Sequence, residues 1–350
     1  MVKEARFVVN DGTKRIFMRS LIQDSGKLSG RPGNGLTYER PGEINTFVSL
    51  AAVLMIVLSV GCQKSPQSAA GPKTFASQDE AAKAVYDAAK AGDSNALLKI
   101  FGADSKDLLF SGDGVQDKKA LDTFTTSYDQ MHRWGALRDG GLVLDVGSEN
   151  YPFPFPLQRN ASGQWYFDNN SAKEEIVARR IGGNELAAIG VLYAMADAQA
   201  EYYSQTHDGS TVQQYAQKFI SSEGKQNGLY WKAAEGQPES PLGPLAAYAS
   251  AEGYAVSTQE SKPFHGYFYR IIAKQGDRAQ GGAQDYIVHG HMSARFAILA
   301  YPAEYRRSGV MSFFINQDGL VVQKDLGEKT ADAAKSIVEF NPDETWKPVE

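Results

Sequence analysis

Two histidines and an aspartate are the residues whose types and spacing come nearest to a metal site. Asp285, His289 and His291 would share one face of a strand, because alternate strand residues point the same way. A His-x-His pair with a carboxylate can chelate zinc or copper. However, Asp285 lies about 13 Å from His289 along a strand, too far for one ion. Only His289 and His291 remain as candidates, and imidazoles are more often solvated or hydrogen-bonded. The sequence therefore predicts no metal and no cofactor.

The single cysteine has a different chemistry, because it directly follows an apolar run. Phe47–Gly61 reads FVSLAAVLMIVLSVG and carries no charge. As a helix it would reach about 22 Å, short of a bilayer core of about 30 Å, and this length suits the apolar region of a secretory signal. The junction Ser59–Cys62 resembles the lipobox of bacterial lipoproteins, although the usual leucine lies one place early, at Leu58. That resemblance implies cleavage before Cys62 and a diacylglycerol on its thiol. The alternative is a buried helix with an incidental thiol.

The residues on either side of this junction fit export with one exception. Residues 62–74 are rich in Pro, Gly, Ser and Ala and read as a flexible tether, whereas 46–61 is the apolar signal region. Residues 1–45 are too long for the start of a signal. They are interpreted as a start codon placed too far upstream or as a disordered extension. The expected location is a membrane facing the periplasm, reached through lipid on Cys62. Gln63 after the cysteine favours the outer membrane.

Composition excludes several other classes of protein. The chain has 350 residues, 42% of them hydrophobic and 22% charged, which suits globular domains rather than a disordered chain. Residues 62–350 hold 28 basic and 36 acidic side chains. This acidic balance argues against nucleic acid as a partner. One cysteine cannot form an internal disulfide.

Periodicity predicts two α+β units, residues 75–170 and 171–350. In the first, Ser77 and Glu80 form a capping box, and further helices follow up to residue 131. Strands are then expected at Leu142–Val146, in Tyr151–Leu157 and at Gln164–Asp168. Proline alternates with aromatic or aliphatic residues in the middle one, which indicates an edge strand or a polyproline-like ribbon.

The second unit is predicted to be a long helix followed by an antiparallel meander. A short helix, Glu174–Arg180, should break at Gly182-Gly183, and Asn184 should cap a helix whose apolar stripe begins at Leu186. Another helical segment is expected to hold Tyr215, Phe219 and Ile220, and a turn-rich loop is expected at 228–245. Strands are expected at Phe264–Ala273, Asp285–His291, Phe296–Tyr301, Val310–Ile315 and Leu320–Lys324. An Asp-Gly turn should join the last two.

Aromatic residues supply the candidate ligand surface. Tyr151, Phe153 and Phe155 alternate along the first unit, and Tyr230 and Trp231 lie together in the second. These side chains could line a sugar or peptide groove. More often, such an alternation forms the core side of a sheet.

Several short motifs together resemble one bacterial family, domain-of-unknown-function family 2950, whose members are mostly exported proteins. The likeness covers about residues 75–348 and implies no known activity or site residue. More faintly, Asn184–Tyr203 and the final hairpin resemble pilin-like secretion proteins. The motifs that carry the family resemblance are Phe75–Ser77, Tyr151–Pro154, Ala178–Gly182, Asn184–Ile189, Gly228–Trp231, Glu239–Pro244, Tyr301–Tyr305 and Ser308–Met311.

The residues outside these motifs assemble no recognisable catalytic centre. There is no Gly-x-Ser-x-Gly elbow, and Cys62 is assigned to lipid. The catalytic residues therefore stay unknown. We expect a non-enzymatic binding or scaffold lipoprotein of the cell envelope, whose partner is an envelope protein or glycan. The alternative is an envelope hydrolase or a module that binds glycan or peptidoglycan.

Overall fold

Helices with polar caps open the described chain. The computed structural model describes residues 71–255 and 262–349, so Cys62, the predicted signal region and most of the predicted tether lie outside the described residues. Ser77 Oγ accepts a hydrogen bond from Glu80 N, and Glu80 Oε2 accepts one from Ala76 N, which confirms the predicted helix start. The helices here are α2 (Gln78–Lys90), α3 (Ser94–Phe101), a 3-10 turn (Ala103–Ser105), α4 (Lys106–Leu109) and α5 (Gly114–Gln130).

A small antiparallel sheet follows these helices. Its strands run in the order β1-β2-β4-β5, and β3 pairs with β2. Phe75 adds a bridge to Trp165 in β5, which brings the start of the described chain back to this sheet. The bounds are β1 (His132–Ala136), β2 (Leu142–Val146), β3 (Tyr151–Pro152), β4 (Leu157–Arg159) and β5 (Trp165–Phe167). The predicted strands at 142–146 and 164–168 are confirmed, whereas 151–157 contains only the two-residue β3 and the first residue of β4.

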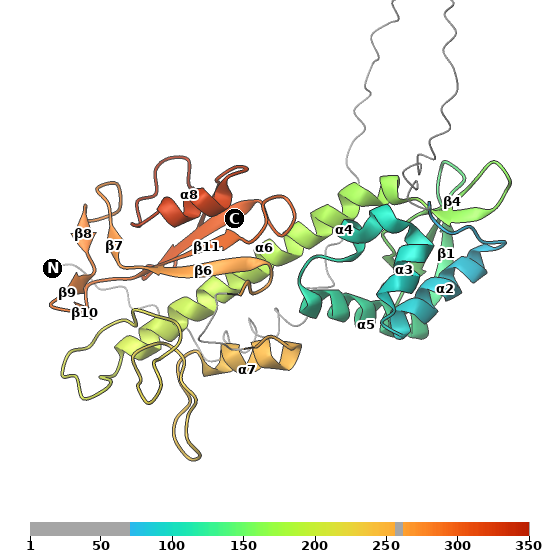
Figure 1. Cartoon of the computed structure of the whole chain (residues 1–350). Coiled ribbons are helices and arrows are strands. Elements are labelled where there is room, and N and C mark those ends of the chain that lie inside the picture. Colours follow the sequence, from blue (N-terminus) through green and yellow to red (C-terminus); the bar gives the residue numbers. More distant parts are fainter. Residues whose placement is uncertain (1–70, 256–261, 350) are drawn as a thin grey trace, which may run out of the picture. The chain divides into compact units, whose positions relative to one another are not determined.

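One helix, α6 (Asn169–Tyr203), runs for 35 residues without interruption (Figure 1). The predicted break at Gly182-Gly183 is wrong. Neither glycine adopts a positive φ, and open space surrounds both. Each glycine weakens a helix by about 1 kcal/mol but keeps its N–H donor. Burial of the residues that follow can therefore compensate, and the helix continues past both glycines.

Asn184 anchors α6 to the second sheet instead of capping a helix. It is 5% exposed, and its Nδ2 donates a 2.8 Å hydrogen bond to the Ser308 carbonyl. The neighbouring Glu185 Oε1 accepts 2.9 Å hydrogen bonds from Val310 N and Met311 N. Two adjacent polar side chains therefore fix the helix against the start of a strand.

The predicted apolar stripe of this helix is only partly buried. Leu186, its first member, is 54% exposed. Ile189 and Tyr193 are partly buried against the core. The fully buried stripe starts at Ala188 and ends at Tyr202, and its other members are Val191, Leu192, Met195 and Ala198.

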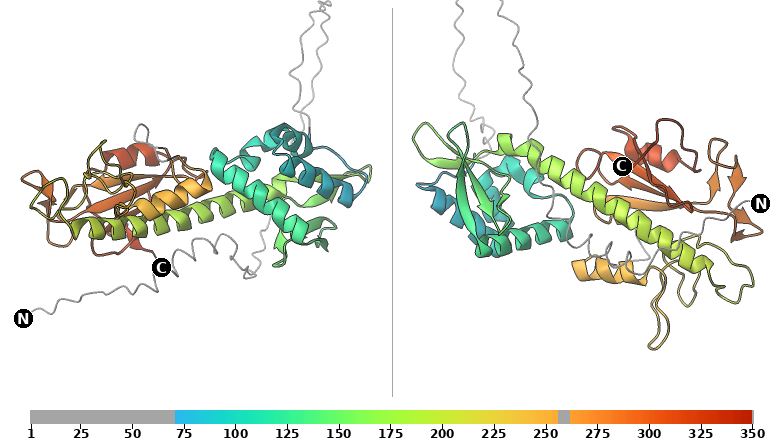
Figure 2. Two further views of the ribbon diagram at one scale, coloured as in Figure 1. Left: turned by 90° about the horizontal axis from the view of Figure 1, so that it is seen from below. Right: turned by 180° about the vertical axis from the view of Figure 1, so that it is seen from behind.

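The second sheet has five antiparallel strands in the order β14-β13-β12-β11-β6. α6 packs against β11 and β12, and α8 (Thr330–Ser336) packs against β11. Figures 1 and 2 show α6 and α8 on opposite sides of this sheet. The predicted class, a long helix on an antiparallel meander, is confirmed. The strands are β6 (Tyr267–Ile272), β11 (Ala297–Pro302), β12 (Met311–Asn316), β13 (Val322–Asp325) and β14 (Lys347–Pro348).

Three other local predictions differ from the structure. Residues 211–220 form no helix but an irregular segment with bridges at Tyr215 and Ile220. The region 285–291 is not one strand, because His289 and Gly290 turn the chain at positive φ. Helix α7 (Gly243–Glu252) begins inside the expected loop, with Pro244 in its first turn, where the missing N–H costs nothing. Short strands β7 (Lys274–Gln275), β8 (Gln284–Asp285), β9 (Ile287–Val288) and β10 (His291–Met292) fill the insertion between β6 and β11.

The described residues belong to one compact unit and contain two main hydrophobic cores. The first gathers around Phe101 and Phe167 and the second around Leu192 and Phe314. Within residues 71–255 and 262–349, no helix has the length and apolar character needed to span a bilayer.

The continuity of α6 predicts whether a substitution at Gly182 stabilises or destabilises the fold. Gly182→Ala should stabilise the fold by about 0.5–1 kcal/mol, because alanine favours an uninterrupted helix and its Cβ meets open space. Urea unfolding measures this. The same substitution at Gly266 is the control and should destabilise, because φ there is +73° and a Cβ would lie 2.6 Å from Asn184 Nδ2. Destabilisation by Gly182→Ala would contradict the continuous helix.

Candidate functional site

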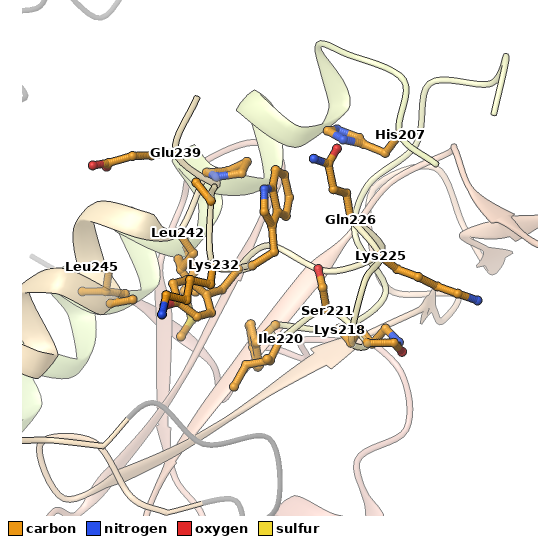
Figure 3. Close-up of a pocket in the computed structure, with 18 of the residues that line it drawn as sticks. His207, Lys218, Ile220, Ser221, Lys225, Gln226, Lys232, Glu239, Leu242 and Leu245 are labelled. Atoms are coloured by element: carbon orange, nitrogen blue, oxygen red, sulfur yellow. The ribbon is translucent and has the colours of Figure 1, made fainter. Parts of the chain in front are cut away.

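An open cleft of about 1520 Å³ lies in the second part of the chain (Figure 3). Its walls come from the end of α6, residues 218–226, residues 230–242, one side of α7 and the start of β6. The cleft is therefore built largely from the turn-rich segment between α6 and the sheet.

Hydrogen bonds between main-chain groups hold this segment in place. Tyr230 N donates to Phe219 O and Ser221 N donates to Tyr230 O, both at 2.8 Å. Leu242 N donates to Leu229 O at 2.9 Å. The loop is thus pinned, as its aromatic and leucine content indicates, and can present side chains in fixed positions.

Gly228 is required where two parts of this segment cross. A Cβ at this position would lie 2.7 Å from the Ile220 carbonyl carbon and from Ser221 N. The Ser221 hydroxyl also accepts a 3.0 Å hydrogen bond from Gly228 N and donates a 3.3 Å one to its carbonyl. The Ser221 side chain therefore stabilises the main chain of the cleft wall at Gly228.

Trp231 and His207 face each other in the cleft wall. Their rings meet edge to face at 5.7 Å, and His207 stacks on Tyr202 at 3.9 Å. His207 Nε2 lies 2.9 Å from the Tyr202 carbonyl oxygen, which fixes the ring. The Trp231 indole N–H has no hydrogen-bond partner among the residues that the structure describes. The partly buried indole thus combines an apolar face with a free donor, as binding sites often do.

Tyr202 closes the base of this aromatic group. Its hydroxyl donates a 2.7 Å hydrogen bond to the Gln226 carbonyl. Burial, together with the nearby Asp208 carboxylate, raises the pKa of Tyr202 to about 12. The phenol therefore stays neutral and keeps this donor role at physiological pH.

Charged side chains of both signs surround the aromatic wall. Lys218 Nζ donates to the Ser222 hydroxyl at 2.7 Å. Across the part of the chain that the structure describes, Lys225, Lys232 and Glu239 take part in no ion pair. Such a rim suits a ligand with both donors and acceptors better than a uniform polyanion.

A buried carboxylate fixes α7, which forms one wall. Glu252 is 10% exposed at its side chain and accepts hydrogen bonds from Lys119 Nζ at 2.6 Å and Tyr248 OH at 2.9 Å. His265 Nε2 lies 3.1 Å from its other oxygen. Burial opposes ionisation, but the nearby His265 imidazole and the hydrogen bonds from Lys119 and Tyr248 prevail and lower the pKa of Glu252 to about 2.

The five predicted aromatic residues do not form one surface. Tyr230 and Trp231 line the cleft. Phe153 and Phe155 instead pack with Phe101, at ring distances of 6.3 and 4.3 Å, and belong to the first core. Tyr151 is 42% exposed, and the Arg179 guanidinium lies 4.6 Å from its ring centre.

The two candidate histidines do not share a strand face. His289 lies in the turn between β9 and β10, at φ +52°. His291 lies in β10, where Nδ1 is 3.2 Å from Gln214 Oε1. Within the described ranges, no group of three His, Cys, Asp or Glu side chains could hold a metal ion.

Sequence reasoning missed most of the cleft. His207 reads as the end of a helix, and Lys232 and Glu239 read as loop charges. One sequence signal could have pointed to this region. Gly228 lies two and three residues before Tyr230 and Trp231 in a turn-rich segment, which is typical of a tightly packed loop that presents aromatic side chains.

The Glu252 pKa predicts how stability depends on pH. A carboxylate whose pKa falls from 4.5 to about 2 on folding contributes up to about 3 kcal/mol, fully present above pH 4.5 and lost as the pH falls toward 2. Glu252→Gln should therefore be less stable than the parent chain at pH 7. Its free energy of unfolding, measured with urea, should also fall less steeply between pH 7 and pH 3. Glu239→Gln, at an exposed carboxylate, should match the parent chain. If the free energy of unfolding of Glu252→Gln falls with pH as steeply as that of the parent chain, the ionised Glu252 carboxylate does not stabilise the fold.

Comparison with known proteins gives a match to a protein family. No curated protein and no solved structure matches this chain significantly, so the similarity to pilin-like proteins stays a prediction. A family model described as a protein of unknown function, DUF2950, matches residues 72–349. This match covers most of the 350 residues and nearly all those that the structure describes. The chain belongs to the DUF2950 family of proteins of unknown function.

Proposed function

We propose that this protein is a lipid-anchored, non-enzymatic binding protein of the bacterial cell envelope, and that its ligand occupies the cleft beside Trp231. The observation that carries the binding role is the Trp231 indole N–H, which has no hydrogen-bond partner among the described residues and lies on a fixed aromatic wall inside a cleft of about 1520 Å³. This volume is large enough for a peptide or an oligosaccharide.

Two neighbouring residues of the cleft favour binding over hydrolysis. The Ser221 hydroxyl is hydrogen-bonded to both backbone groups of Gly228. His207 is held by the Tyr202 carbonyl and by ring stacking. A nucleophile and its base need a hydrogen bond to each other, whereas each of these side chains supports the backbone instead.

The anchor rests on the sequence. The uncharged run Phe47–Gly61 ends at Cys62, and a polar stretch joins the cysteine to the folded residues. A diacylglycerol on the thiol would hold the binding unit at the periplasmic face of a membrane, with the outer membrane favoured by Gln63. The cleft would then meet envelope proteins or glycans.

The anchor predicts labelling of the mature chain. Cells that express the full chain and grow with radiolabelled palmitate should yield a labelled protein whose first residue is Cys62. Cys62→Ala should lose both the label and the membrane fraction, because no thiol remains to carry lipid. A labelled Cys62→Ala protein, or a mature chain that begins elsewhere, would contradict the anchor.

The cleft predicts a ligand response that depends on Trp231. A purified muropeptide, polysaccharide or peptide that raises the melting temperature of the chain should bind at least about tenfold more weakly to Trp231→Ala, because the aromatic contact is lost. Thermal shift and calorimetry measure this. Tyr151→Ala, at an exposed aromatic outside the cleft, should keep the response. Equal losses in both variants, or none in Trp231→Ala, would refute the site.

A further inference from the structure

The strand that borders the cleft, β6, is an edge strand of the second sheet. In the order β14-β13-β12-β11-β6, and among the residues that the structure describes, β6 pairs as a strand only with β11. Its other edge therefore presents main-chain N–H and C=O groups that no described strand uses.

The register identifies which groups point outward. Tyr267 exchanges two hydrogen bonds with Phe264: Phe264 N donates at 2.8 Å and Tyr267 N donates at 3.1 Å. The backbone groups of Tyr267 thus face away from β11. Antiparallel pairing alternates with a period of two, so those of Tyr269 and Ile271 face the same way. Neither residue has a further main-chain partner in 71–255 or 262–349.

The cleft wraps around this edge. Phe268 and Tyr269 both line it, although successive strand residues point to opposite faces of a sheet. The faces are marked by two other residues of β6: Tyr267 donates to the Met311 carbonyl, whereas Arg270 reaches the last carbonyls of α8. A cleft that touches both faces of one strand opens on the edge of that strand.

We propose that the ligand of this cleft is an extended polypeptide segment, which adds a sixth strand to the sheet along β6. The outward groups of Tyr269 and Ile271 repeat at about 6.8 Å, the two-residue repeat of an extended chain. A glycan has no alternating N–H and C=O groups at this spacing. This inference rests on the proposed function and names its ligand class.

The surroundings of β6 fit the side chains of such a segment. Tyr230 and Trp231 lie in the same cleft and offer apolar contact. Lys232 and Glu239, which form no ion pair with the described residues, offer one charge of each sign. Main-chain pairing gives affinity in this mode, and contacts with alternate side chains give specificity.

The test removes a single N–H from the outward edge. Peptides are selected from a phage library of random dodecapeptides on the full chain in detergent, and one is synthesised. Ile271→Pro should weaken its binding at least tenfold in calorimetry, because proline lacks the N–H that the added strand needs. Ile271→Val keeps this group and should bind within twofold of the parent chain.

Hydrogen exchange supplies a second readout that does not depend on the folding of a variant. In the parent chain, the bound peptide should slow exchange of the Tyr269 and Ile271 amides at least tenfold. Unchanged exchange there, or equal affinity in Ile271→Pro, overturns strand addition. Failure to select any peptide also overturns it.

Other outcomes separate this inference from the proposed function. If only a glycan binds, and Trp231→Ala abolishes that binding, the strand proposal fails and the binding role stands. If neither a peptide nor a glycan binds, the strand proposal and the binding role both fail.

Discussion

The burial of one side of α6 against the second sheet is the contact on which the rest of the structure depends. The helix continues through two glycines because the segment beyond them is held by packing and by two polar anchors. Asn184 and Glu185 bind the chain at Ser308, Val310 and Met311, where β12 begins. Ala172, near the start of α6, belongs to the first core. A single helix therefore contributes to both hydrophobic cores.

The cleft follows from where this helix ends. Tyr202 in its last turn stacks on His207, and the chain then crosses itself at Gly228 before it reaches α7. Main-chain hydrogen bonds fix this crossing, and Tyr230 and Trp231 stay partly exposed in the cleft. On the opposite wall, the Glu252 carboxylate ties α7 to Lys119 of α5. The proposed binding surface is therefore irregular in secondary structure but fixed in position.

The sequence identifies the class of fold and fails where tertiary contacts outweigh local preference. Caps and alternation correctly predict the start of α2 and the strand Leu142–Val146, because local hydrogen bonds and a half-buried sheet set them. The break at Gly182 is wrong, since burial compensates for the cost of glycine. Apolar residues on more than one side of α6 also hide the buried face, so Leu186 proves exposed. The sequence offers Trp231 as a candidate for a ligand surface, but its contact with His207 depends on a loop crossing that periodicity does not reveal.

The most direct measurement of the central claim, a ligand cleft that faces the cell envelope, is photocrosslinking in intact cells. A benzophenone amino acid replaces Lys232 in the cleft or, for comparison, the exposed Lys83 on α2. The account predicts adducts at position 232 that mass spectrometry assigns to exported polypeptides, with few adducts at position 83. Equal labelling at both positions, or adducts with cytoplasmic proteins, would contradict it.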